Sequence, residues 1–214
     1  MKPANDPSVD YRVLVRDNYD HLAADYDDKR AGEAPPQLAL LTSRLAQGAA
    51  VLDIGCGAGV PVAKTLAERC IVTGVDISGG MIARARSNVP GATFIHGDIT
   101  AIDFPPSQFD AAVAFYSIFH LPREEHPDLL RRIYGWLKPG GWLLATLSYH
   151  NEAPYMEEYM GQTMFWSNYS LEEYRDLLKE TGFTVVEETA IGAGYEDPDD
   201  SPEERHPLIL ARKE

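Results

Sequence analysis

The sequence predicts an α/β fold built on a mostly parallel β-sheet, and two observations carry this prediction. Apolar runs typical of strands end near Ile54, Val75, His96 and Phe115, about every twenty residues, with helix-like segments between the early ones. A glycine-rich stretch, VLDIGCGAGV, includes the end of the first run and continues beyond it. Such loops join a strand to a helix in many α/β folds that bind ligands.

Composition limits the range of partners. A chain of 214 residues is long enough for one domain with a sizeable core, and we expect a single domain over residues 1–214. The net charge of −14 disfavours nucleic acid, because phosphate binding needs clustered lysine and arginine. Apolar runs are too short to span a bilayer, and the N-terminus lacks the apolar stretch of a signal peptide. We expect a cytoplasmic protein with no membrane partner, and its oligomeric state is left open.

Helices are predicted from apolar spacing and from residues that start or stop them. Near the N-terminus, one helical face is formed by Tyr19, Leu22, Ala23 and Tyr26. Pro61 can open the helix after the glycine loop as its first residue, where the missing N–H does no harm. The next helix should begin near Ser78 and end before Pro90.

The second half of the chain adds helices and strands in the same way. A helix is expected over residues 129–137, ending at the sequence KPGG, and WLLAT then reads as a fifth strand. An irregular stretch should run to Ser167. Ser170 and Glu173 form a capping box for a helix that ends at Gly182. The stretches TVVEET and PLILAR are expected to pair as antiparallel strands at the sheet edge.

Carboxylates stand at three successive strand ends, beside the glycine loop. Asp53 precedes the glycines, and Asp76 and Asp98 close the next two strands. Carboxyl ends of parallel strands meet at one crevice, and buried carboxylates need partners, so a polar ligand is favoured. The glycines read Gly-x-Gly-x-Gly, whereas the dinucleotide fingerprint is Gly-x-Gly-x-x-Gly. Two plainer interpretations remain open, a tight turn for the loop and helix capping for Asp98.

The combined motifs resemble the class I S-adenosylmethionine-dependent methyltransferases. The resemblance runs from YDHLAADYDD through VLDIGCGAG, VDIS, GDI and FDAAVAFYSIFHLP to LKPGGWLL, nearly the whole chain. It implies a Rossmann-like fold with a seven-stranded sheet of order 3-2-1-4-5-7-6, strand seven antiparallel and helices on both faces. It also implies S-adenosylmethionine as the methyl donor.

The resemblance assigns roles at the donor site to residues of this sequence. Asp53 would organise the loop and the methionyl amino end, Asp76 would take the ribose hydroxyls, and Asp98 would bind the adenine amine. An N-terminal helical lid over residues 1–33 would close over the donor. The further residues expected at the donor site are Tyr19, Tyr26, Gly55, Gly57, Gly59, Ile77, Met81, Ile99 and Phe115.

The acceptor side is expected after the fourth strand, where the sequence reads FYSIFHLP. Tyr116 and His120 are the candidate catalytic residues; the pKa expected of a histidine suits His120 as a general base, although it can also merely brace the loop. Residues 149–169 are rich in tyrosine and methionine and form a predicted acceptor-side insertion, although core packing also explains such a composition. The remaining histidines show no metal-ligand spacing, so we expect no metal.

These observations favour a methyltransferase that acts on a small molecule, aromatic or otherwise apolar. O-, N- and C-methylation are not separated by these residues. Two alternatives stay open. One is an NAD-dependent dehydrogenase, which lacks the last fingerprint glycine here. The other is a module that binds S-adenosylmethionine or S-adenosylhomocysteine without catalysis.

Overall fold

The computed structural model describes residues 2–3, 10–30, 34–192 and 205–214 of the chain. The side chains of residues 2–3 and 25–30 lie outside this description. The first residue, residues 4–9 and residues 31–33 of the predicted lid therefore also lie outside it.

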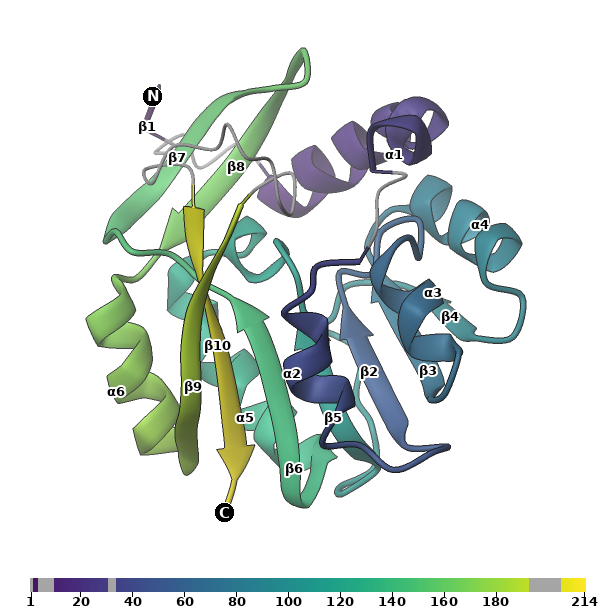
Figure 1. Cartoon of the computed structure of the whole chain (residues 1–214). Helices are drawn as coiled ribbons and strands as arrows, with labels where there is room; N and C mark the ends of the chain where they lie inside the picture. Colours follow the sequence, from purple (N-terminus) through teal and green to yellow (C-terminus); the bar gives the residue numbers. More distant parts are fainter. Residues whose placement is uncertain (1, 4–9, 31–33, 193–204) are drawn as a thin grey trace.

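A central sheet of seven strands organises the fold (Figure 1). In chain order its strands are β2 (Ala50–Ile54), β3 (Ile71–Asp76), β4 (Thr93–His96), β5 (Phe109–Ala114), β6 (Leu137–Thr146), β9 (Phe183–Gly192) and β10 (Arg205–Lys213). Their order across the sheet is β4-β3-β2-β5-β6-β10-β9. β10 runs antiparallel to both neighbours, and the pairs among the first five strands are parallel. Numbered within the sheet alone, this is the predicted order 3-2-1-4-5-7-6, and the fold prediction is confirmed.

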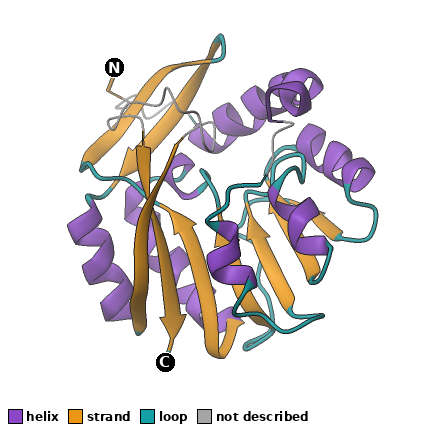
Figure 2. Cartoon of the chain, in the orientation of Figure 1, coloured by secondary structure: helices purple, strands orange, loops and turns teal. Residues whose placement is uncertain are grey.

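Helices cover both faces of the sheet (Figure 2). One layer contains α2 (Leu38–Thr42), α3 (Val62–Ala67) and α4 (Gly79–Asn88), and the other contains α5 (His126–Trp136) and α6 (Leu171–Thr181). Consecutive residues of β2 point to opposite layers: Val51 packs with the first set of helices and Leu52 with the second. Because both faces of the sheet are buried, β2 and β5 read as continuous apolar runs rather than as alternating ones.

Local capping explains where α4 and α6 begin and where α6 ends. Ser78 is the N-cap of α4 and accepts a hydrogen bond from the Met81 amide at 3.0 Å. Ser170 and Glu173 form the predicted capping box of α6, and Gly182 ends that helix with φ of 106°. The expectation for Pro61 was wrong by one position: it is the N-cap of α3, and the first helical residue is Val62.

A second, three-stranded sheet replaces the irregular stretch expected up to Ser167. It pairs β1 (Lys2–Pro3) with β7 (Glu152–Tyr159), and β7 with β8 (Gln162–Asn168). The two residues between β7 and β8, Met160 and Gly161, both have positive φ, 52° and 79°. Two such residues make a tight hairpin turn. The sequence signal for this turn is Asn-Gly or Asp-Gly, and Met-Gly does not match it. The prediction failed for that reason.

The first helix, α1 (Tyr11–Arg30), packs against β8 and α4. Figure 1 shows α1 between the β7–β8 hairpin and α4, beyond the ends of the parallel strands. Within the described residues, no helix is long and apolar enough to cross a membrane.

Candidate functional site

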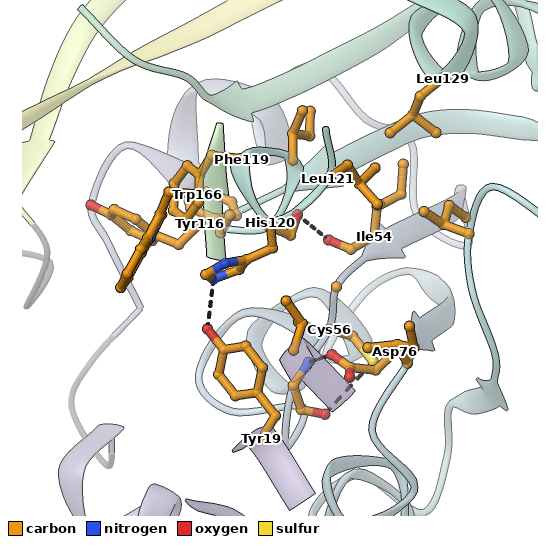
Figure 3. A pocket seen from close by; sticks show the side chains of 18 of the residues that line it. Tyr19, Ile54, Cys56, Asp76, Tyr116, Phe119, His120, Leu121, Leu129 and Trp166 are labelled. Carbon is orange, nitrogen blue, oxygen red and sulfur yellow. Dashed lines mark hydrogen bonds between the residues drawn. The ribbon is translucent and has the colours of Figure 1, made fainter. Parts of the chain in front are cut away.

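A cavity of about 440 Å³ opens where the parallel strands β2, β3 and β5 end. Residues that follow these strands line one side, and side chains from α1, β7 and β8 line the other. Figure 3 shows the cavity extending from Cys56 and Asp76 to Phe119, His120 and Trp166. Open α/β sheets bind ligands at the carboxyl ends of their strands. The cavity therefore joins the glycine loop to the segment after β5.

The glycine loop turns sharply after β2. Gly55, Gly57 and Gly59 have φ of 67°, 53° and 76°, values that glycine adopts without strain. A Cβ on Gly55 would lie 2.3 Å from that of Ser117, so the loop passes close to the segment after β5. Gly55 and Gly57 line the cavity. The structure places Gly59 off the cavity wall, where a Cβ would lie 3.3 Å from Ala85 of α4, so Gly59 serves packing.

Asp76 connects the glycine loop to α4 and lines the cavity. One carboxylate oxygen accepts the Gly57 amide and the other accepts the Ser78 amide, each at 2.8 Å. Burial raises the pKa of Asp76, and these two hydrogen bonds oppose that rise. Asp20 of α1 extends the connection, because one of its oxygens accepts the Ser78 hydroxyl at 2.6 Å and the Gly80 amide at 2.8 Å. The carboxylate that was expected to meet a ribose thus also fixes the loop.

Asp53 is the least satisfied polar group on this side of the cavity. It is 2% exposed, and its Oδ2 atom is buried with no hydrogen-bond partner among the described residues. Burial raises its pKa to about 7, and the charge of Asp76 contributes to the rise. A buried carboxylate of this kind gains most from a ligand that brings an N–H group or a positive charge.

Asp98 holds the N-terminal helix. One carboxylate oxygen accepts from Arg12 Nε at 2.5 Å, and the other accepts from the Thr100 amide and hydroxyl, each at 2.8 Å. Burial alone would raise the pKa of Asp98, but these hydrogen bonds outweigh it and lower the pKa. Arg12 also donates to Glu125 at 2.6 Å, as does the Tyr11 hydroxyl at 2.7 Å. The carboxylate expected at the adenine amine is therefore engaged with α1.

Arg12→Gln should loosen α1, because it removes two charged hydrogen bonds that tie the helix to Asp98 and Glu125. The Arg12 side chain is 33% exposed, so we expect a loss of about 1 kcal/mol rather than the full value of a buried pair. Amide hydrogen exchange across α1 should become about fivefold faster. The matched control is Arg16→Gln in the same helix, which removes a pair with the adjacent Asp17. Equal exchange in both variants would show that Arg12 does not hold the helix.

His120 occupies the other end of the cavity and pairs with Tyr19 of α1 (Figure 3). Its Nδ1 lies 2.8 Å from the Phe165 carbonyl, and its Nε2 lies 2.9 Å from the Tyr19 hydroxyl. A carbonyl only accepts, so Nδ1 carries the proton, and in the neutral ring Nε2 accepts from Tyr19. Burial lowers the pKa of His120 to about 4, so the ring is neutral at neutral pH.

Tyr116 lines the cavity, and its hydroxyl is bonded to the backbone of β9. It has φ of 51°, and the hydroxyl donates to the Gly192 carbonyl of β9. The ring lies edge-on to His206, with centroids 5.4 Å apart. The hydroxyl is thus tied to β9, so Tyr116 is placed to shape the wall.

Aromatic rings from the β7–β8 hairpin form much of the cavity wall near His120. Trp166 stacks on Tyr155 with ring centroids 5.6 Å apart, and Tyr159 meets the same indole edge-on at 6.0 Å. Trp166 also lies 5.8 Å from the His120 ring. This wall suits an apolar or flat ligand placed beside His120.

Most residues predicted from the sequence meet in this one cavity. They are Tyr19, Asp53, Gly55, Gly57, Asp76, Ile77, Asp98, Ile99, Phe115, Tyr116 and His120. Met81 does not line it and is instead fully buried with Ala23 and Ala58. Tyr26 lies in α1, but its side chain is outside the described residues. No three histidine, cysteine or acidic side chains of the described part are grouped to hold a metal.

Other lining residues were not predicted individually, among them Arg12 and Arg205, while Trp166 and Asn168 were expected only as part of the insertion at residues 149–169. Each stands far along the chain from the glycine loop and in no recognisable motif. For Trp166 and Asn168, a usable signal was the strand character of β8, which places alternate residues on one face. Arg12 and Arg205 carry no local signal, since an arginine near a chain end usually lies in solvent.

Residues 51–141 match the family model described as a methyltransferase domain. A curated relative is phosphoethanolamine N-methyltransferase 1 of Arabidopsis thaliana, 32% identical over 151 residues. The match covers 66% of this chain and 30% of that protein, so this chain spans under a third of the relative's length.

Two solved structures share the fold over nearly the whole chain. One is the 1,6-didemethyltoxoflavin-N1-methyltransferase of Burkholderia thailandensis with bound 1,6-didemethyltoxoflavin and S-adenosylhomocysteine, with a TM-score of 0.73 and 23% identity. That match covers 99% of this chain and 93% of the other. The second is magnesium protoporphyrin IX methyltransferase of Synechocystis with bound S-adenosylmethionine, with a TM-score of 0.73, 16% identity, and 98% and 100% coverage.

Proposed function

We propose that the chain is an S-adenosylmethionine-dependent methyltransferase that transfers a methyl group to a small molecule, a proposal that the methyltransferase-domain match and the similar N-methyltransferase support. The observation that carries the proposal is one cavity with Asp53 and the glycine loop at one end and His120 at the other. A fold by itself does not determine a reaction, so the proposal rests on these residues.

The residues at the glycine-loop end fit the methyl donor. Among the described residues, Asp53 has a buried oxygen without a partner, which suits the ammonium of the methionyl end. Gly55 and Gly57 present backbone without side chains to the cavity. One Asp76 oxygen accepts from Gly57 of the loop and the other from Ser78, and each oxygen can accept another hydrogen bond from a ribose hydroxyl. When bound, the donor supplies a methyl group on a sulfonium, which is already activated for displacement.

Donor binding should weaken as the pH falls, because Asp53 has a pKa raised to about 7 in the free protein. A cationic amino group binds the ionised carboxylate, so protons compete with the ligand. We expect the Kd for S-adenosylhomocysteine to rise about tenfold from pH 8 to pH 6. Asp53→Asn should bind weakly at both pH values and lose this dependence. Calorimetric titrations at the two pH values test this, and a pH-independent wild type would contradict the assignment.

The same pKa predicts the direction of a stability change. Because the folded pKa of Asp53 exceeds the unfolded value, the free protein binds this proton more tightly than the unfolded chain does. The resulting contribution of Asp53 to the free energy of unfolding is fully present below about pH 4 and is lost as the pH rises through about 7. Saturation with S-adenosylhomocysteine should reduce the loss, since the ligand stabilises the ionised form.

We assign proton removal to the pair formed by Tyr19 and His120. The Tyr19 hydroxyl donates to His120 Nε2 at 2.9 Å, and a phenolic oxygen that donates its proton can also accept one. An acceptor O–H or N–H can pass its proton to this oxygen while the Tyr19 proton moves to Nε2. The imidazolium would then keep its bond to the Phe165 carbonyl. General-base assistance of this kind is worth ~10²–10⁴ in rate.

We also propose that α1, within the predicted lid of residues 1–33, covers the donor. Tyr19 reaches His120, and Asp20 holds the start of α4. Arg12 pairs with Asp98 at the other end of the cavity. A helix held at these places can keep water from the reacting atoms.

Turnover with a panel of acceptors tests the proposal. The panel includes phosphoethanolamine and 1,6-didemethyltoxoflavin, the compounds in the names of two similar proteins. Formation of S-adenosylhomocysteine that depends on an added acceptor supports methyl transfer. Stabilisation by NAD but not by S-adenosylmethionine would favour a dehydrogenase. Donor binding without turnover by any panel member would favour the non-catalytic module.

A further inference from the structure

Besides Asp53 Oδ2, two buried polar atoms of the cavity residues lack partners within the described part of the chain. They are Arg205 Nε, a donor, and Asn168 Oδ1, an acceptor. The Asn168 amide nitrogen donates to Glu152 at 2.8 Å, which fixes which way its oxygen faces. Buried polar atoms are nearly always hydrogen-bonded. An unpaired donor and an unpaired acceptor in one cavity therefore indicate a polar ligand.

Arg205 stands on a rigid element. It is the first residue of β10 and pairs with Gly192 of β9. Two residues on, the Pro207 carbonyl accepts the Leu147 amide at 2.9 Å, so this end of the strand is fixed in the sheet. Figure 1 shows β10 beginning at the side of the sheet nearest the β7–β8 hairpin, which supplies the aromatic wall.

Charged side chains of both signs line the cavity. Arg12 and Arg205 are its two cationic side chains, and Arg12 is neutralised by Asp98 and Glu125. No ion pair of Arg205 is found among the described residues. Asp53 and Asp76 make the glycine-loop end negative. Glu152 also lines the cavity, but it accepts the Asn168 amide, so among the described lining residues Arg205 is the cation left to attract an anion in this chain of net charge −14.

We propose that Arg205 binds an anionic oxygen group of the methyl acceptor, a carboxylate or a phosphate, and thereby selects acidic acceptors; this rests on the proposed methyl transfer. A guanidinium has only donors and stays charged, and its planar fork matches these two groups. Asn168 Oδ1 then accepts an O–H or N–H of the same molecule. The apolar body lies along the Tyr155–Trp166 pair, which leads to His120.

This arrangement makes Arg205 a specificity-determining residue rather than a catalytic one. The anion is held at the β10 end, and repulsion by Asp53 and Asp76 keeps it from the donor end. The opposite end of the acceptor is thereby directed toward Tyr19 and His120. Neutral analogues of the same shape lose the anchor and leave the guanidinium unpaired.

The test uses benzoate and inorganic phosphate as probes in calorimetric titrations of the full chain, with and without saturating S-adenosylhomocysteine. We expect one probe to bind, and which one identifies the carboxylate or the phosphate as the recognised group. Arg205→Gln should weaken its binding at least tenfold, and Arg205→Lys should retain part of it. The control Arg175→Gln removes an exposed pair with Glu188 and should bind the probe like wild type.

Failure of this inference is distinguishable from failure of the proposed function. Unchanged S-adenosylhomocysteine affinity in Arg205→Gln shows that the variant is folded. If wild type binds S-adenosylhomocysteine but neither probe in either titration, the role of Arg205 is overturned and methyl transfer stands. Equal probe binding by wild type and Arg205→Gln overturns it as well. If S-adenosylhomocysteine itself does not bind, the proposed function fails.

Discussion

Gly57→Val should reduce the affinity for S-adenosylhomocysteine by more than about 100-fold, the loss expected when backbone strain and steric exclusion act together. Gly57 has φ of 53°, a region that β-branched residues almost never adopt. It also lines the cavity, so the valine methyl groups would fill space that the donor needs. Calorimetric titration of the purified variant measures the effect.

Gly48→Val provides the matched control, since it repeats the backbone strain away from the cavity. Gly48 has φ of 77°, and a Cβ built there meets nothing within 4 Å. This variant should lose stability but keep its donor affinity. If Gly57→Val binds S-adenosylhomocysteine as wild type does, the glycine loop does not hold the donor.

His120→Ala should lower the methyl-transfer rate by ~10²–10⁴ while donor affinity changes little, if the acceptor must lose a proton. The substitution removes the group that receives the Tyr19 proton and leaves the Phe165 carbonyl without its partner. Tyr19→Phe should give a comparable loss, because it removes the oxygen that meets the acceptor. Single-turnover measurements with saturating donor separate this effect from binding.

His126→Ala is the matched control, because it removes a buried histidine that lies outside the cavity. His126 is fully buried, stacks on Tyr174 and also has a pKa lowered by burial to about 4, but it does not line the cavity. Its loss should lower stability and leave turnover per folded molecule nearly unchanged. A rate loss below tenfold in His120→Ala would mean that His120 braces its loop and that alignment alone carries the reaction.

The sheet was predictable because its signals are local. The apolar runs end where β2, β3 and β4 end, and the capping residues Ser78 and Ser170 mark helix starts within a few residues of sequence. The family prediction drawn from these motifs is confirmed by the methyltransferase-domain match over residues 51–141. The β7–β8 hairpin was missed because its Met160–Gly161 turn gives no standard signal.

The site was predictable where strand ends converge and unpredictable where distant segments meet. The sheet order brings Asp53 and Asp76 to one edge, and sequence alone placed both there. The pairing of Arg12 with Asp98 spans 86 residues, and that of Tyr19 with His120 spans 101. Such contacts depend on how α1 packs, which no local pattern encodes. Gly59 and Met81 show the converse, because residues inside a motif can serve packing instead of binding.

Calorimetric titration of the wild-type chain with S-adenosylmethionine, S-adenosylhomocysteine and NAD tests the central claim most directly, that this cavity holds the methyl donor. We predict one-to-one binding of both sulfur compounds and none of NAD, with the affinity abolished in Gly57→Val and reduced at low pH through Asp53. Binding of NAD without binding of S-adenosylmethionine or S-adenosylhomocysteine would contradict the claim.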